Sequence, residues 1–590
     1  MAILGISDSH NAAAALVDGT GRLRALQEER PTREKNHAGM PTRSIAWLLS
    51  EAGLKPGDVS KVAVANLDPF RPMNRAETLR SMEVSGTLKG RLLSAARRTP
   101  LMRGVYARRR TDRMARLAAL GFRPEQVTAY DHHLCHAATA AYGADHGPGP
   151  VLVVTCDGAG DGLCATVSVL RDGRLERRHA VDWSHSFGVL YAVVTYMLGM
   201  VPNEHEYKIM GMAPYAAPTA AARVSERLLA LFEWDPAGAP TWARASGVPH
   251  MMTIQPTLER LFRGQRFDAV MGGVQMFCEA MLREFVRRAV ATTGIARVAA
   301  SGGVFMNVKA NKAILDMPEV ESLFVFPSCG DETNAIGAAW LARVGEDGAG
   351  GVTPLRTMYL GPEWGEDAVL AAFRPAEADG RITLERPDDV NAAVADCLAA
   401  GEVVARFAGP EEFGARSLGN RAILADPRRP EVIQVINDLV KSRDFWMPFA
   451  ASVMAEHAAE YMRMPKGVRA PYMILSFDST PAGWEAMRAG THPYDRTCRP
   501  QVVAREDNPA YWDLLRQFRD RTGVGGLLNT SLNLHGLPLV HRPEDALEVL
   551  ERSGLARLAI GPFLVTRRAA RAESAEELRR SLAASTEVRV

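Results

Sequence analysis

The sequence predicts an α/β protein with two domains, and three observations lead to this fold class. The chain opens with three short apolar segments divided by polar or glycine turns, which is typical of a meander of strands. Segments beginning at residues 298 and 323 each read as strand, glycine turn and helix. At residues 345–354, GEDGAGGVTP, glycine and charge replace hydrophobic periodicity, so a second domain is expected to follow.

Composition narrows the class of protein further. The chain has 590 residues, of which 47% are hydrophobic and 23% charged, so several packed cores are expected and general disorder is excluded. Lysine and arginine number 70 against 68 aspartate and glutamate, a balance that argues against nucleic acid as the main partner.

The sequence shows no recognisable signal for export, membrane insertion or disulfide formation, and this predicts the cellular compartment. The opening MAILGISDSH has neither the basic flank nor the apolar run of a signal peptide, and the apolar stretch 189–201 is shorter than a membrane span. The seven cysteines are scattered and form no CxxC motif. We therefore expect a cytoplasmic protein without a membrane partner or a disulfide framework.

The first domain is expected to contain further strands, helices and one insertion. Asp131 is a good N-cap for a helix that starts HHLCHAATAAYG. A basic insertion at about 70–120 holds thirteen Lys/Arg against three Asp/Glu between residues 70 and 116, and Leu88, Leu92 and Leu93 are spaced for an amphipathic helix. It is either a solvated helical cover or a wall for an anionic or large substrate. The predicted strands are residues 2–7, 12–17, 23–28, 126–130, 151–156, 163–170, 298–301 and 323–326.

The second domain begins with a helix at residue 393. A helix is also expected over residues 430–440, and the segment VGGLLNTSLN predicts a buried strand that leads into a polar loop. The other predicted strands are residues 403–407 and 422–425.

A candidate metal site combines two histidines and two aspartates. His132 and His136 are four residues apart on a predicted helix, the spacing that lets two imidazoles share one ion. Asp157 and Asp331 follow predicted strands, at sheet tips where ligands converge. Such a set suits iron, manganese or zinc, although a satisfied histidine pair without metal is the alternative. The metalloprotease motif HExxH is absent because residue 133 is His.

Other residues are candidates for acid–base chemistry and for binding anions. His10 could take a proton from a hydroxyl nucleophile, or it could be a solvated residue of a turn. Lys208 and the turn SGGVFMN could hold a nucleotide. In the second domain a set of cations and small polar residues could clamp a triphosphate and a second anion, with dispersed surface arginines as the alternative. This set is Arg416, Lys441, Arg443, Arg499, Ser417, Asn529, Ser531 and Asn533.

Many segments together resemble the O-carbamoyltransferase family of the TobZ, NodU and CmcH type. They occur in family order and cover most of the chain outside the basic insertion. The segments are SDSHNAAAAL, EERPTREKNH, DHHLCHAATA, TCDGAGD, EYKIMGMAPY, SGGVFMNVKAN, CGDETNAIGAAW, FGARSLGNRAILADPR, INDLVKSRDFWMPFAASV, TCRPQVV and LLNTSLNLHGLPLV.

This resemblance implies a fold and a division into domains. Residues 1–350 would form paired RNase H-like halves of the actin, sugar-kinase and heat-shock ATPase superfamily, and would transfer the carbamoyl group. Residues 351–390 would be a linker and connecting segment. Residues 391–590 would form a YrdC-like domain that makes carbamoyl-adenylate from carbamoyl phosphate and Mg-ATP.

The resemblance also assigns roles to residues. His132, His136, Asp157 and Asp331 match the metal ligands, with iron ahead of manganese or zinc, and His10 matches the base. Lys441 and Arg416 match catalytic residues of the second site. The matched positions for nucleotide or carbamoyl phosphate are Lys208, Gly302, Gly303, Asn307, Arg416, Lys441, Arg443, Arg499, Asn529 and Ser531.

The expected reaction is ATP-dependent carbamoylation of a hydroxyl on a small specialised metabolite, antibiotic-like or a sugar. The alternatives are HypF-like carbamoylation of a protein thiol, whose CxxC pairs are missing here, and a non-enzymatic nucleotide-dependent regulator. The family usually reads RPF where this chain reads Met447, Pro448 and Phe449, so one anion-binding cation is replaced. A homodimer and the identity of the acceptor are left open.

Overall fold

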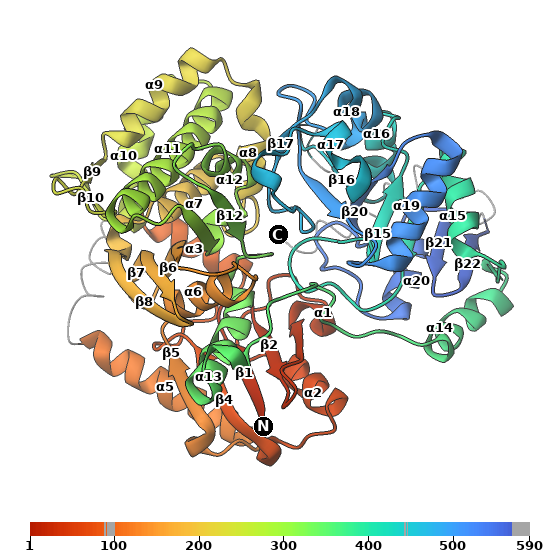
Figure 1. Ribbon diagram of the computed structural model, residues 1–590, viewed down its shortest axis with the longest axis horizontal. Helices are drawn as coiled ribbons and strands as arrows, with labels where there is room; N and C mark the ends of the chain where they lie inside the picture. Colours follow the sequence, from red (N-terminus) through yellow and green to blue (C-terminus); the bar gives the residue numbers. More distant parts are fainter. Residues whose placement is uncertain (86, 88–89, 91–100, 442–443, 445, 569–590) are drawn as a thin grey trace.

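The first five strands of the chain form one sheet with β1 at its centre. In this computed structural model, residues 86, 88–89, 91–100, 442–443, 445 and 569–590 are outside the described part of the chain (Figure 1). The strand order is β3-β2-β1-β4-β5. β1 is antiparallel to β2 and parallel to β4, which is parallel to β5. The bounds are β1 (Ala2–Ser7), β2 (Ala13–Val17), β3 (Leu23–Gln27), β4 (Val59–Ala65) and β5 (Val127–Tyr130).

A second sheet repeats this arrangement. Its order is β12-β11-β6-β7-β8, so that β6 is antiparallel to β7 and parallel to β11, as β1 is to β2 and β4. The two halves thus share one topology, which confirms the predicted paired α/β halves. The bounds are β6 (Val151–Gly160), β7 (Leu163–Arg171), β8 (Arg174–Asp182), β11 (Arg297–Ser301) and β12 (Ser322–Val325).

Two helices join the halves. α6 (His132–Tyr142) packs on β6 and β11, α13 (Asn334–Asp347) packs on β1 and β4, and the two helices contact each other. Their alanine-rich faces are buried in one core with strands of both sheets, because small side chains allow the close approach. The N-terminal ends of these helices therefore lie near the strand ends that carry the candidate site.

The remaining helices of this part lie mostly over the second sheet (Figure 1). They enclose a large apolar core around Phe277 and Phe285. The bounds are α1 (Glu29–Thr32), α2 (Thr42–Glu51), α7 (Phe187–Met197), α8 (Glu206–Met212), α9 (Pro218–Leu229), α10 (Gln255–Phe262), α11 (Phe267–Thr293) and α12 (Val308–Leu315), with the small strands β9 (Phe232–Trp234) and β10 (Trp242–Arg244).

The basic insertion contributes two described helices, α3 (Arg75–Ser85) and α5 (Leu101–Ala119). Leu88, Leu92 and Leu93, for which an amphipathic helix is predicted, lie outside the described residues. α5 is not wholly a solvated cover, because Leu117 and the Arg113 side chain are buried.

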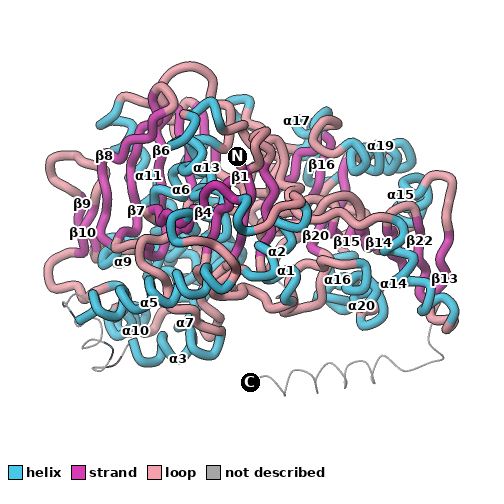
Figure 2. The backbone as a smooth tube through the Cα atoms, turned by 90° about the horizontal axis from the view of Figure 1, so that it is seen from below, coloured by secondary structure: helices cyan, strands magenta, loops and turns pink. Residues whose placement is uncertain are grey.

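The second domain is built on one mixed sheet of eight strands, in the order β13-β22-β21-β14-β15-β20-β16-β19. α15 (Val390–Ala399) and α19 (Pro509–Thr522) cover one face, and α14 (Glu366–Ala378), α16 (Val432–Ile436) and α20 (Pro543–Arg552) cover the other (Figure 2). The predicted α/β class is confirmed here too, while YrdC-like identity stays a prediction.

The strands of this sheet are β13 (Ile382–Glu385), β14 (Val404–Phe407), β15 (Arg421–Ala425), β16 (Ala450–Met454), β19 (Pro500–Val503), β20 (Gly526–Ser531), β21 (Arg557–Ile560) and β22 (Phe563–Arg567). Smaller elements are α17 (Ala458–Tyr461), α18 (Pro481–Ala486), β17 (Phe477–Asp478) and β18 (Thr497–Cys498). The helix predicted over residues 430–440 is shorter, because α16 gives way to a π-helical turn, Asn437–Lys441.

The predicted linker at residues 351–390 does more than connect. It contains α14 and β13, and β13 pairs with β22 at the edge of the second sheet. The boundaries at 350 and 391 themselves stay predictions.

A buried arginine of the first domain reaches the second. Arg30 is 2% exposed; it donates to the Gly414 carbonyl over 2.6 Å, and its Nε lies 3.3 Å from Glu411 Oε1. Gln27 Oε1 accepts from the Gly414 backbone N–H over 2.9 Å. The loop at residues 408–420, which bears Arg416, is thereby held against the first domain.

All seven cysteines are free thiols. Within the part of the chain that the structure describes, every helix is too short or too polar to serve as a membrane span.

Candidate active site

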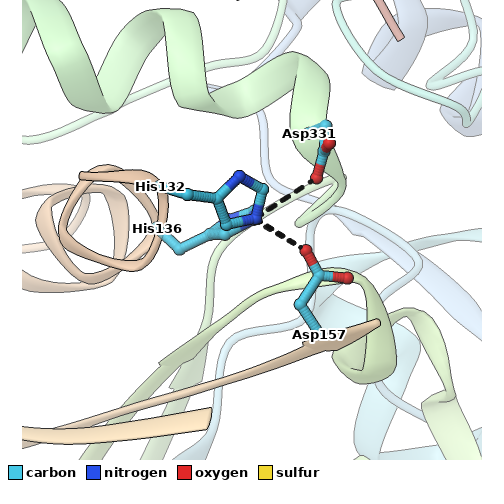
Figure 3. A group of neighbouring side chains, drawn as sticks. All are labelled: His132, His136, Asp157 and Asp331. Carbon is cyan, nitrogen blue, oxygen red and sulfur yellow. Dashed lines mark hydrogen bonds and ion pairs between the residues drawn. The ribbon is translucent and has the colours of Figure 1, made fainter. Parts of the chain in front are cut away.

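The four predicted metal ligands come together at the tips of several elements. The Asp131 side chain accepts from the Leu134 backbone N–H and starts α6, so that His132 and His136 project from one helix face. Asp157 comes from β6 and Asp331 from the turn before α13, and both carboxylates point at the imidazoles (Figure 3). One ligand atom from each of the four residues lies within 4.8 Å of the others.

The contacts form a compact set of two nitrogens and two oxygens. The Oδ2 atom of Asp157 lies 2.9 Å from His132 Nε2 and 3.3 Å from His136 Nε2. The Oδ1 atom of Asp331 lies 3.6 Å from each of the same two nitrogens. Mixed imidazole and carboxylate ligands suit a divalent transition metal, and these residues fit one.

Neighbouring groups orient the histidine rings. His132 Nδ1 lies 2.6 Å from Asn66 Oδ1, and His136 Nδ1 lies 3.4 Å from Ser301 Oγ. With a proton on each Nδ1, both Nε2 lone pairs face the carboxylates, as metal ligation requires. Asn334 lies close by, with its Nδ2 3.2 Å from His136 Nε2 and its Oδ1 buried without a hydrogen-bond partner among the described residues.

The electrostatics of the pair reflect this carboxylate shell. Burial disfavours the charged imidazole, but the carboxylates of Asp331 and Asp157 outweigh it and raise the pKa of His132 to about 9. Burial would raise the pKa of Asp157, yet hydrogen bonds from His132 and His136 lower it well below its usual value. By contrast, burial together with the neighbouring His132 and His136 lowers the pKa of His133 to about 3. His133 instead contacts Thr155 Oγ1 at 2.8 Å, away from the carboxylates.

His10 borders this cluster. Its Nδ1 lies 3.3 Å from Asp331 Oδ2, and its side chain is 35% exposed. The ring centroid of Phe70, from the start of the basic insertion, lies 6.1 Å away. The imidazole of His10 is therefore partly open to solvent next to the start of the insertion.

The predicted nucleotide residues of the first domain lie in three places: at a glycine turn, at the start of α12 and on α8. Gly302 has φ +108°, and a Cβ on Gly303 would lie 2.8 Å from Asp157 Oδ1, so this glycine turn presses directly on the cluster. Asn307 caps α12 through the Ala310 N–H and exchanges hydrogen bonds with Gln275. Lys208, on α8, forms a 2.9 Å ion pair with Asp444 of the second domain.

A second polar cluster surrounds Lys441. The Lys441 Nζ donates to Ser531 Oγ over 3.2 Å and to Asn533 Oδ1 over 2.6 Å. Asn529, two residues earlier on β20, contacts Ser417 Oγ at 3.2 Å, directly beside Arg416.

Strand register brings Arg499 to the same end of the sheet. Ala450 pairs with Asn529, and its neighbour Ala451 pairs with Pro500, so Arg499 and Asn529 flank β16 in one row. The structure thus gathers Arg416, Lys441, Arg499, Asn529 and Ser531 around one sheet end, whereas Arg443 lies outside the described residues.

Sequence reasoning missed several residues that complete the first site. Asn66 follows β4 at the C-terminal end of a parallel strand, a signal of the same kind as that of Asp157. Glu332 is buried beside Asp331; it accepts from Ser328 Oγ over 2.5 Å, and Ser328 Oγ in turn accepts from the Ala415 N–H over 2.9 Å. This short chain of contacts joins the first site to the Arg416 loop.

Comparisons with known proteins cover nearly the whole chain. The family model described as Carbamoyltransferase N-terminus matches residues 2–340, and the one described as Carbamoyltransferase C-terminus matches residues 395–567. The nodulation protein NolNO of Sinorhizobium fredii is 31% identical over 575 residues, 97% of this chain and 81% of that protein.

Two other relatives align with a smaller part of this chain. Nodulation protein NolO of Bradyrhizobium diazoefficiens is 33% identical over 454 residues, 77% of this chain and 81% of that protein. The 3'-hydroxymethylcephem-O-carbamoyltransferase of Amycolatopsis lactamdurans is 29% identical over 266 residues, 44% of this chain and 47% of that protein.

Proposed function

The chain belongs to the carbamoyltransferase family, as its sequence predicts, and from this membership we propose that it is an ATP-dependent O-carbamoyltransferase with two reaction centres. The acceptor would be a hydroxyl of a small specialised metabolite. The name of the cephem relative, which states transfer to an oxygen of a hydroxymethyl compound, supports a hydroxyl acceptor.

The observation that carries the proposal is the presence of two chemically different clusters. One is rich in His and Asp and adjoins His10. The other holds Lys441 among small polar groups, beside the backbone positions of Arg416 and Arg499. Cations suit phosphate groups, whereas the first cluster suits an ion and a base, so the two clusters support two successive half-reactions.

We assign activation to residues 391–590. Carbamoyl phosphate first loses its phosphate to water, which gives carbamate and inorganic phosphate. A carbamate oxygen then attacks the α-phosphate of Mg-ATP, and pyrophosphate leaves to give carbamoyl-adenylate. Lys441, Arg416 and Arg499 would hold the phosphate charge during these steps, and Asn529 and Ser531 would fix positions through hydrogen bonds.

We assign transfer to residues 1–350, with the nucleotide held near Lys208, Gly302, Gly303 and Asn307. A divalent metal held by His132, His136, Asp157 and Asp331 would draw electron density from an oxygen of the adenylate. His10 would donate its Nδ1–H to the Asp331 carboxylate, which leaves Nε2 free to take the proton of the acceptor hydroxyl. The acceptor oxygen then forms the new C–O bond, and AMP leaves with the electrons of the broken bond.

The test is product analysis. With ATP, carbamoyl phosphate and a competent acceptor, we expect AMP and pyrophosphate, each dependent on both substrates, together with inorganic phosphate from carbamoyl phosphate. Release of ADP with carbamoyl phosphate unchanged would contradict the proposal and indicate a kinase.

A further inference from the structure

Arg113 ties the basic insertion to two parts of the candidate site. It lies on α5, and its side chain is 5% exposed. Its Nη2 and Nε donate to the two carboxylate oxygens of Asp8 over 2.7 and 2.8 Å. Such a bidentate pair fixes both groups in one orientation. Asp8 lies two residues before His10, in the turn that follows β1.

The same guanidinium holds a second turn. Arg113 Nη1 donates to the Asn66 carbonyl over 2.7 Å, while the Asn66 side chain contacts His132 Nδ1. Asn66 has φ +73°, a left-handed conformation that Asn adopts more readily than other non-glycine residues. Arg113 is therefore separated from a candidate metal ligand by a single residue.

Asp161 holds the other side of this turn. Its carboxylate accepts from the backbone N–H groups of Leu67 and Asp68 over 2.9 and 3.0 Å. It also accepts from the His132 N–H over 2.8 Å. The turn at residues 66–68 is thus fixed between Arg113 and the start of α6.

We propose that Arg113 is a positioning residue, through which helix α5 of the basic insertion orients His132 by way of Asn66 and the His10 turn by way of Asp8. The insertion is then a structural part of the transfer site. This inference rests on the proposed metal site but not on the adenylate chemistry.

The experiment measures Mn²⁺ affinity of the full-length protein by titration calorimetry and follows the bound ion by its paramagnetic resonance spectrum. Arg113→Ala should weaken Mn²⁺ binding by about 10- to 100-fold, the usual cost of losing a group that orients a ligand. Arg113→Lys keeps the charge but not the two parallel donors of the guanidinium. Its Mn²⁺ affinity should therefore lie between that of the wild type and that of Arg113→Ala. Arg116→Ala, at an exposed arginine one turn along the same helix, is the matched control and should bind as the wild type does.

The route through Asn66 is tested separately. Asn66→Gly removes the side chain and favours the positive φ, so it should weaken Mn²⁺ binding without straining the turn. If both residues act on His132, the double variant should bind about as weakly as the weaker single variant, rather than showing the product of the two losses.

Wild-type Mn²⁺ affinity in both Arg113 variants would overturn the proposal, and if Arg113→Ala does not fold, Arg113→Lys decides alone. A wild-type protein that binds no Mn²⁺ would overturn it as well. A wild-type protein that binds Mn²⁺ but releases no AMP would contradict the proposed reaction and leave the role of Arg113 standing.

Discussion

Met447 lies against Gly211 across the contact between the two domains: a Cβ on Gly211 would come within 2.7 Å of the Met447 sulfur. Met447 is 8% exposed, and its neighbour Trp446 donates from Nε1 to the Lys208 carbonyl over 3.2 Å. Met447 is therefore buried against α8.

Met447→Arg should lower both stability and activity. The longer, charged side chain would have to enter a buried contact that glycine keeps narrow, and overpacking of this kind costs about 1 to 3 kcal/mol. Met447→Leu, similar in volume, is the control and should cost less than about 1.5 kcal/mol. Denaturant unfolding and steady-state kinetics measure both effects. A lower KM for ATP or carbamoyl phosphate with an undiminished kcat in Met447→Arg would contradict this prediction.

Replacing a candidate metal ligand should remove the metal. His136→Ala or Asp331→Ala leaves the donor set incomplete, so we expect metal affinity to fall by more than about 100-fold and transfer to be lost. Elemental analysis of the purified variants measures the metal content. His133→Ala is the control on the same helix and should keep the metal. Wild-type metal content and activity in both ligand variants would show the cluster to be structural.

Two substitutions should separate the half-reactions. Lys441→Ala removes the cation at Ser531 and Asn533, so carbamoyl-dependent release of pyrophosphate and AMP should stop. His10→Ala should still release pyrophosphate but transfer about 10² to 10⁴ times more slowly. Separate assays of pyrophosphate and carbamoylated product distinguish the two steps. Transfer by His10→Ala at the wild-type rate would refute the assignment of the base.

Phe70 should contribute to acceptor binding. Its side chain is 42% exposed and its ring lies 6.1 Å from that of His10, so it offers an apolar wall beside the reacting hydroxyl. Phe70→Ala should raise the acceptor KM by about 10-fold, equivalent to about 1.4 kcal/mol, with less effect on kcat. Pyrophosphate release without acceptor is the internal control and should not change. An unaltered KM would place the acceptor elsewhere.

The fold was predictable wherever one segment carried its own pattern. The opening meander and the strand-to-helix turns at residues 298 and 323 occur as expected, because alternation and glycine turns are local properties. α14 and β13 lie in the segment predicted as a linker. β13 becomes a strand by pairing with β22, whose paired residues lie 179 to 185 positions later in the chain. The π-helical turn before Lys441 has no clear local signature.

The site followed the same rule. His132, His136, Asp157 and Asp331 could be chosen because helix spacing and strand ends are visible in the sequence, and the structure brings them together. Asn334 and Arg113 could not, because their partners come from segments far away in the chain. The buried contacts of Arg113 depend on tertiary packing, which the charge-rich sequence of α5 does not reveal.

The burial of Arg30 between the domains limits how the enzyme can be dissected. Truncation near residue 350 would leave a fragment with Arg30 exposed and another with Glu411 deprived of its guanidinium, though still 2.6 Å from His541. Separately expressed fragments are therefore poor models of each half-reaction. If the two fragments are produced together, recovery of activity should depend on Arg30. Such a split version of the chain would therefore report on assembly of the two domains.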